Sequence, residues 1–347
     1  MRPRKLVRIA PSHYHVGHIV PAMVAKEMGY FEEEGLTHYD LYSGGLIPAL
    51  VEKVALRRAM KEKGVDIVPD VKPGSVLQLA ARGEDVFVVG AWRNRQDFQF
   101  FGAKGLRSLA ELRGKRIGIR DFGGIGHTVL SFHLRRAGID PEKDVIFIRS
   151  ARFHPHERPD EALRQGEVEC IHLLASDNRG LDKEGYPILL ESRKIYPQGR
   201  PDRVIVATCR MIEEDSDLLM AYLRATIRAY WFITDYERNR AYLEALVRRL
   251  RRACLDEEEA QRSGLEGGGR LSLPFDGAPS LQGLHTMVEE AKETGEIDPG
   301  FDLAKILRLE LVQGAFKELA ARDGLKEVIR RVRAIYDGKE GSKNRAE

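Results

Sequence analysis

The order of strand and helix patterns predicts an α/β fold of mostly parallel sheets flanked by helices, with further helices toward the C-terminus. Strand-like and helix-like segments alternate up to Ser216, and long helical patterns follow from there. The run 86–91, VFVVGA, is continuously apolar, as buried parallel strands tend to be. A length of 347 residues predicts about two domains.

The first part of the chain reads as a repeated strand–helix alternation. Gly29 ends one apolar-periodic helix, and a turn at 43–45 follows the second strand. We expect strands over 5–10, 38–42, 65–69 and 86–91, and helices over 19–28, 47–63 and 76–82.

A Gly-rich turn lies at the centre of the next part. Residues 116–121, RIGIRD, alternate as a strand does, and glycines follow in 122–126. Thr128 then opens a helix that ends before Gly138, and Ser108 is expected to accept from the amide of Glu111 in a capping box. Further strands are expected over 145–149, 169–174, 188–192 and 203–208, and helices over 158–165, 217–236, 239–252, 281–294 and 304–337.

Composition and charge narrow the function classes. The formal net charge is +3 with acidic and basic residues interleaved, so we expect neither a nucleic-acid nor a membrane partner. The three cysteines are far apart and form no CxxC, which argues against a disulfide framework or a thiolate metal site. No signal-peptide pattern follows Met1. The sequence as it stands is therefore expected to be cytoplasmic; if an export segment precedes it, the protein is periplasmic or extracellular.

Several segments together resemble one family. They are AKEMGYFEEEGL at 25–36, LAARG at 79–83, GLRSLAELRGKRIG at 105–118, AGIDPEKDV at 137–145, ALRQGEV at 162–168, SLQGL at 280–284 and GEID at 295–298. In this order and spacing they are similar to type II periplasmic binding proteins. The closest subgroup comprises the aliphatic-sulfonate, nitrate and taurine binding proteins and the fungal thiamine-pyrimidine synthases.

The resemblance implies a two-lobed substrate-binding protein of the ABC-transporter type, or a cytoplasmic derivative of one. Lobe 1 would be 1–98 plus 206–347 and lobe 2 would be 99–205, with hinge closure near 98–102 and 201–206. Loops at the carboxyl ends of strands line the ligand cleft in such folds. That rule gives the candidate ligand-binding residues Ser12, His13, His15, Ser43, Gly44, Ser75, Trp92, Arg93, Arg95, Gly124, Gly126, His127, Thr128, Ser176 and Asp177.

The chemistry of these residues predicts a small organic anion as ligand. A strand, a Gly-rich turn and a helix N-terminus present free amides to an anion, helped by the hydroxyl of Thr128 and by His127 if it is protonated near pH 6.5. Arg93 or Arg95 can donate a planar fork to a carboxylate, sulfonate or phosphate, and Trp92 could stack on a ring.

Two alternatives remain open at this point. His13, His15 and His18 could converge on a metal, although pocket hydrogen bonding is favoured and no metal or cofactor is expected. The chain could also be an enzyme on the same fold, such as a decarboxylase, hydrolase or thiamine-pyrimidine-synthase-like enzyme, using His13, His15 or His127.

Synthase chemistry is the least favoured of these. The histidine that the synthases consume falls at Ser75, and only Lys72, offset by one residue, could hold pyridoxal phosphate. An ABC permease is an expected partner only if an export signal has been removed.

Overall fold

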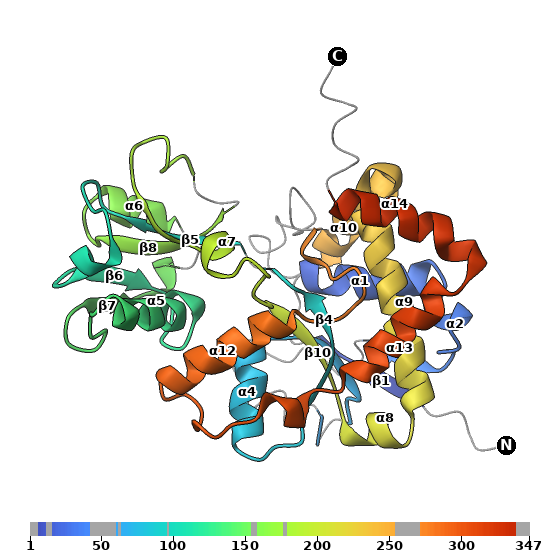
Figure 1. The fold of residues 1–347 in the computed structure, drawn as a ribbon. Coiled ribbons are helices and arrows are strands. Elements are labelled where there is room, and N and C mark those ends of the chain that lie inside the picture. The colour runs from blue at the N-terminus through green and yellow to red at the C-terminus, as the bar shows by residue number, and fades with distance from the viewer. Residues whose placement is uncertain are drawn as a thin grey trace. The chain divides into compact units, whose positions relative to one another are not determined.

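The computed structural model describes residues 6–11, 16–41, 60–61, 64–95, 97–153, 158–175, 179–253 and 271–337. The chain forms two compact units, each with its own sheet (Figure 1). The first unit comprises Met1–Asn94, Pro201–Pro279 and Asp302–Glu347, and the second comprises Arg95–Arg200 and Ser280–Phe301.

The first unit is built on a five-stranded mixed sheet in the order β2 (Tyr39–Leu41), β1 (Val7–Ile9), β3 (Ile67–Val71), β10 (Arg203–Ala207) and β4 (Phe87–Arg93). β1 pairs in parallel with β2 and β3. β10 is antiparallel to both β3 and β4, so β4 runs in the same direction as β3. The expected α/β class is confirmed, with one reversed strand in the sheet.

Helices cover this sheet, and α9 (Ser216–Thr234) carries the largest buried side chains, Tyr222, Tyr230 and Trp231. The others are α1 (Val16–Glu27), α2 (Tyr30–Glu33), α4 (Pro73–Ala81), α8 (Cys209–Glu213), α10 (Tyr236–Ala253), α13 (Leu309–Ala320) and α14 (Lys326–Tyr336). The helix expected over 47–63 lies almost wholly outside the described residues. None of the helices in the described part of the chain is long and apolar enough to cross a membrane.

The single helix expected over 304–337 is wrong. A 3₁₀ turn at Leu303–Ile306, then α13, a second 3₁₀ turn at Asp323–Leu325 and α14 occupy this stretch. Leu307 is extended and forms a bridge with Val88 of β4, and the amide of Arg308 donates to the Val88 carbonyl at 2.9 Å. Because β4 is an edge strand, its free carbonyl competes with helix formation at this point.

The second unit repeats the plan with the order β7 (Ile146–Arg149), β6 (Arg116–Ile119), β8 (Cys170–Leu174), β5 (Phe98–Gly102) and β9 (Ile188–Glu191). β6 is parallel to β7 and β8, whereas β5 is antiparallel to β8 and β9. α5 (Ile125–Arg136) packs on one face, against a core that includes Phe98, Phe100 and Ile117. α6 (Pro159–Arg164) contributes to the core on the other face, and α7 (Ser192–Ile195) and α12 (Leu281–Glu293) complete the unit.

The compact units and the expected lobes differ in one element. α12 lies in the second unit, where it packs on α5 and Glu293 pairs with Arg136 at 3.2 Å, although 206–347 was expected in lobe 1. The expected hinge segments form β5 and β10, which are fully buried strands. Each is the first strand after the chain passes from one unit to the other, and each is the reversed strand of its sheet.

The capping box predicted at Ser108 is also wrong. The Ser108 side chain makes no capping hydrogen bond, and the Glu111 amide donates to the Ser108 carbonyl at 3.3 Å. The Glu111 carboxylate accepts from the amide of Arg107 at 2.8 Å, one residue earlier than expected. The segment is a single 3₁₀ turn, Leu109–Leu112, whose tighter i to i+3 bond brings the backbone carbonyl to the amide first.

Candidate ligand-binding site

Polar side chains gather at one edge of the first sheet. β1, β3 and β4 point the same way, so their carboxyl ends meet at this edge. β10 is reversed, so its first residue, Arg203, lies there too. Open α/β sheets bind ligands at the carboxyl ends of their strands. We call His18, Asp70, Ser75, Trp92, Arg93, Asp202 and Arg203 the edge cluster.

A buried histidine–carboxylate pair forms one part of the edge cluster. His18 lies in the first turn of α1, and Asp70 is the penultimate residue of β3. His18 Nδ1 and Asp70 Oδ2 are 2.5 Å apart, with the carboxylate side chain fully buried. Ser75, in the first turn of α4, is 7% exposed. Because a buried carboxylate needs a donor, Asp70 fixes Nδ1 as the protonated nitrogen and orients the ring.

Trp92 is already in contact with two neighbours. Its ring stacks on His18 with centroids 5.1 Å apart, and the Arg93 guanidinium carbon lies 4.4 Å from the indole centroid. Trp92 is only 3% exposed, so its ring has little free surface for the stacking on a ligand that the sequence suggested. The indole instead holds His18 and Arg93 in place by stacking and cation–π contact.

Arg93 is short of negative partners. Its Nη1 lies 3.5 Å from Asp202 Oδ2, and Arg203 Nη1 lies 3.6 Å from the other oxygen of the same carboxylate. Burial lowers the pKa of Arg93, the charge of Asp202 raises it, and the charge of Arg203 lowers it further, with a net lowering. One carboxylate is therefore shared by two guanidinium groups.

In the second unit, the Gly-rich turn leads into α5 as predicted, but three residues earlier. Gly124 is the N-cap, with φ −81° and ψ 169°, and the helix begins at Ile125. The amides of His127 and Thr128 donate to the Gly124 carbonyl at 2.9 and 2.8 Å, and the Thr128 hydroxyl donates there as well at 3.1 Å. The amides of Ile125 and Gly126 come before the first intrahelical bonds and are the ones placed to meet an anion.

His127 does not behave as expected from sequence. The amide of Gly123 donates to its Nδ1 at 3.3 Å, which requires an unprotonated nitrogen. Burial, and then the charge of Arg135, lower the pKa of His127, so protonation near pH 6.5 is wrong and the ring is neutral at pH 7. A donor toward a ligand can come only from Nε2.

The three glycines of the turn have different roles. Gly123 alone is left-handed, with φ +79°. A Cβ on Gly126 would lie 3.5 Å from the Cβ of His172 in β8, so the missing side chain of Gly126 faces the sheet. Close approach of a ligand is therefore not what glycine at 126 provides; it lets α5 pack closely on β8.

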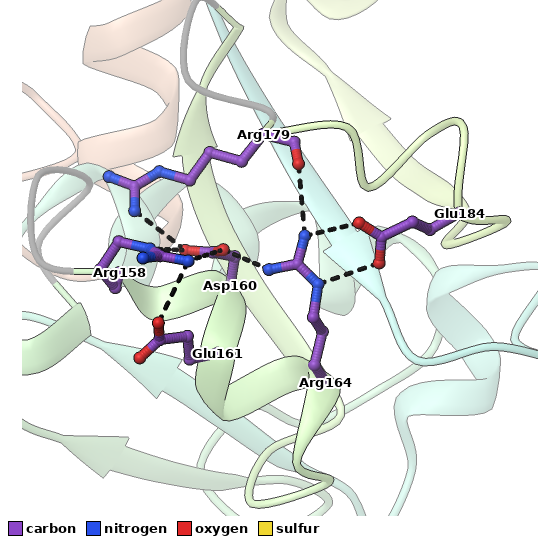
Figure 2. A network of polar contacts seen from close by, with 6 residues as sticks. All are labelled: Arg158, Asp160, Glu161, Arg164, Arg179 and Glu184. Atoms are coloured by element: carbon purple, nitrogen blue, oxygen red, sulfur yellow. Dashed lines mark hydrogen bonds and ion pairs between the residues drawn. The ribbon is translucent and has the colours of Figure 1, made fainter.

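An ion-pair network holds the chain just beyond Ser176 and Asp177 (Figure 2). Arg179 and Arg158 have left-handed φ values of 51° and 45°, and both pair with the fully buried Asp160, at 3.1 and 3.4 Å. Asp160 also pairs with Arg164, which in turn pairs with Glu184 at 2.8 Å. The network fixes Arg179 in a conformation that non-glycine residues rarely adopt.

Several predicted site residues cannot be placed. Ser12, His13, His15, Ser43, Gly44, Ser176 and Asp177 lie outside the described residues. Arg95 belongs to the second unit and donates to the Pro197 carbonyl at 3.3 Å. Within the described ranges, no three His, Cys, Asp or Glu side chains group as a metal site.

Sequence reasoning missed Asp70, Asp202 and Arg203 as members of the site. Each carries a charge inside an apolar strand pattern, IVPDV at 67–71 and DRVIVA at 202–207. A charge in a strand that is otherwise apolar was the signal that could have found them.

The comparisons with known proteins agree with this architecture. A family model described as NMT1/THI5 like matches residues 17–238. No curated protein matches the chain. The periplasmic sulfonate-binding protein SsuA from Methylobacillus flagellatus is 17% identical with a TM-score of 0.64, over 92% of this chain and 96% of that one.

Two further solved structures have the same fold. The aliphatic sulphonate binding protein SsuA from Escherichia coli is 15% identical with a TM-score of 0.59, over 88% of this chain and 92% of that one. The desulfurization enzyme DSZB in complex with biphenyl-2-sulfinic acid is 13% identical with a TM-score of 0.55, over 91% of this chain and 100% of that one. The chain belongs to the NMT1/THI5-like family and has the two-sheet fold of type II periplasmic binding proteins.

Proposed function

We propose that this protein binds a small organic anion at the edge cluster of its first unit. The observation that carries the proposal is the excess of positive charge at this edge, where Arg93 and Arg203 share Asp202. Arg93 is held by Trp92 and loses hydration through partial burial, so an added anion gains more there than it would at an exposed arginine.

The second unit supports the same ligand class. Its α5 begins after a glycine N-cap at the carboxyl end of β6, and the first-turn amides of Ile125 and Gly126 suit an oxyanion. The His127 ring is neutral and adds no charge there. A receptor for a carboxylate, sulfonate or phosphate fits both edges better than a receptor for a cation.

The relatives of this fold favour the same ligand class. The SsuA structures are named as sulfonate-binding proteins, so sulfonates are the first ligands to screen against this chain.

The experiment is mass spectrometry of small molecules released when the purified protein is denatured. The proposal predicts an organic anion at near-stoichiometric amount, and it predicts rebinding of that molecule to the emptied protein. Recovery of a neutral or cationic molecule that rebinds, with no anion bound by the emptied protein in a screen of carboxylates, sulfonates and phosphates, would overturn it.

An enzyme on the same fold is the second candidate, and the His18–Asp70 pair favours it. A carboxylate that holds Nδ1 leaves Nε2 of the imidazole as the proton acceptor, which is how general bases are oriented. DSZB is an enzyme with this fold. Thiamine-pyrimidine-synthase chemistry fits poorly, because Ser75 has no imidazole to give up.

Turnover separates the two candidates. A receptor returns the recovered anion unchanged after long incubation, whereas an enzyme converts it at a rate that Asp70→Asn reduces about 10²-fold or more. Unchanged anion after incubation with wild-type protein would remove the enzyme.

A further inference from the structure

The first unit contains two arginines that face each other across neighbouring strands. Arg203 of β10 and Arg93 of β4 are direct partners in the antiparallel register, so their side chains leave the same face of the sheet. Like charges placed directly opposite destabilise a sheet. The register also shifts between Arg203 and Val204, and such bulges commonly re-aim a side chain beside a functional site.

The only carboxylate that pairs with these arginines in the described part of the chain is Asp202, and it does so loosely. Its oxygens lie 3.5 Å from Arg93 Nη1 and 3.6 Å from Arg203 Nη1. Charge-assisted hydrogen bonds are shorter, about 2.7–2.9 Å. The Nε atoms of both arginines are buried and have no hydrogen-bond partner among the described residues. Arg203 is 9% exposed and Asp202 is 7% exposed.

Two other arginine clusters show how this protein normally satisfies such groups. Around Glu34, three arginines (Arg224, Arg228 and Arg322) pair with three carboxylates (Glu34, Glu33 and Glu318) at 2.6–2.8 Å.

The network in Figure 2 is balanced in the same way, with Arg158, Arg164 and Arg179 against Asp160, Glu161 and Glu184. In contrast, the pair Arg93 and Arg203 faces one carboxylate, which leaves one positive charge without a partner.

We propose that Arg93 and Arg203 form a clamp for the oxyanion group of the ligand, and that this group carries a single negative charge. One added negative charge brings two guanidinium groups and two anions into balance, as in the other clusters. A doubly charged phosphate or sulfate would leave an excess negative charge beside the buried Asp202. The clamp therefore favours a carboxylate or a sulfonate. This inference rests on the proposed function and names the ligand chemistry of its site.

The sign of each charge change gives the test. The probes are methanesulfonate and acetate, with sulfate as the doubly charged comparison, at constant ionic strength. Binding is followed by the fluorescence of Trp92, which touches Arg93, and by the rise in melting temperature. Arg203→Gln and Arg93→Gln should each weaken the better probe at least about tenfold, the worth of a charge-assisted hydrogen bond. Asp202→Asn should tighten it, because the competing carboxylate is gone.

Arg82→Gln is the matched control, since Arg82 is an exposed arginine that ends α4 and makes the same change in net charge. It should leave affinity unchanged. The clamp is overturned if Arg203→Gln retains wild-type affinity, if Asp202→Asn weakens binding, if Arg82→Gln weakens it as much as Arg203→Gln, or if sulfate binds more tightly than both singly charged probes.

The two singly charged probes also distinguish the ligand source, since preference for methanesulfonate indicates a sulfonate and preference for acetate a carboxylate. The clamp can fail while the proposed function stands, namely if the molecule recovered from the protein binds Arg203→Gln as well as wild type. If wild type binds neither that molecule nor any probe, the proposed function itself fails.

Discussion

Replacing Asp160 by asparagine should loosen the part of the second unit that follows Ser176 and Asp177. The side chain is fully buried and is paired with Arg164, with Arg179 at 3.1 Å and with Arg158 at 3.4 Å. Removing one member of a buried ion pair costs about 3–5 kcal/mol. Arg158 is 58% exposed and contributes little, so we expect a loss of about 3 kcal/mol in the free energy of unfolding.

The pH dependence of this loss follows from the pKa of Asp160. Burial raises that pKa, but hydrogen bonds from Arg158 and Arg164 and the charge of Arg179 outweigh it, so the net shift is downward. A carboxyl with a lowered folded pKa stabilises the protein fully above its unfolded pKa of about 3.9, and the contribution disappears as pH falls through the folded value. The difference between wild type and Asp160→Asn should be constant from pH 7 to about pH 5 and shrink below about pH 4.

Urea denaturation followed by circular dichroism measures this difference. Glu161→Gln is the control, because Glu161 is 46% exposed and pairs only with the exposed Arg158, so its loss should stay within about 0.5 kcal/mol. If Asp160→Asn unfolds within that same margin at pH 7, the network does not hold this segment.

Three further changes test particular statements about the structure. Gly126→Ala should fold normally and gain up to about 1 kcal/mol of stability, because an added Cβ makes only ordinary contact with His172; a loss in urea denaturation would contradict this. The imidazole of His127 should titrate below pH 6.5 by NMR, because burial and Arg135 lower its pKa, and a midpoint above pH 6.5 would be inconsistent with the Gly123 hydrogen bond. Glu34→Gln should cost about 3 kcal/mol or more at pH 7, because three arginines then surround a neutral group, and thermal melting equal to wild type would refute this.

Most of the fold was predictable because its signals are local. The apolar run 86–91 and the glycine turn before α5 give the strands and helices of the sheets directly. The break in the expected helix 304–337 was not predictable, since it depends on the free carbonyl of Val88, which lies far away in the sequence. The position of α12 in the second unit likewise depends on its packing against α5.

The site was only partly predictable for the same reason. Trp92 and Arg93 were found because they directly follow a buried strand. Asp202 and Arg203 join them only because β10 runs antiparallel to β4 and brings residue 203 opposite residue 93, which no local pattern reveals. The lowered pKa of His127 depends on burial, and burial of a single side chain cannot be read from its neighbours in sequence.

A crystal soaked with 2-bromoethanesulfonate gives the most direct test of anion binding at the edge cluster. This probe carries one negative charge on a sulfonate, and its bromine can be located by anomalous scattering. The account predicts a bromine peak at the carboxyl edge of the first sheet, beside Arg93 and Arg203, which is lost in Arg203→Gln crystals. Peaks that occur only at exposed arginines, with none at this edge, would contradict it.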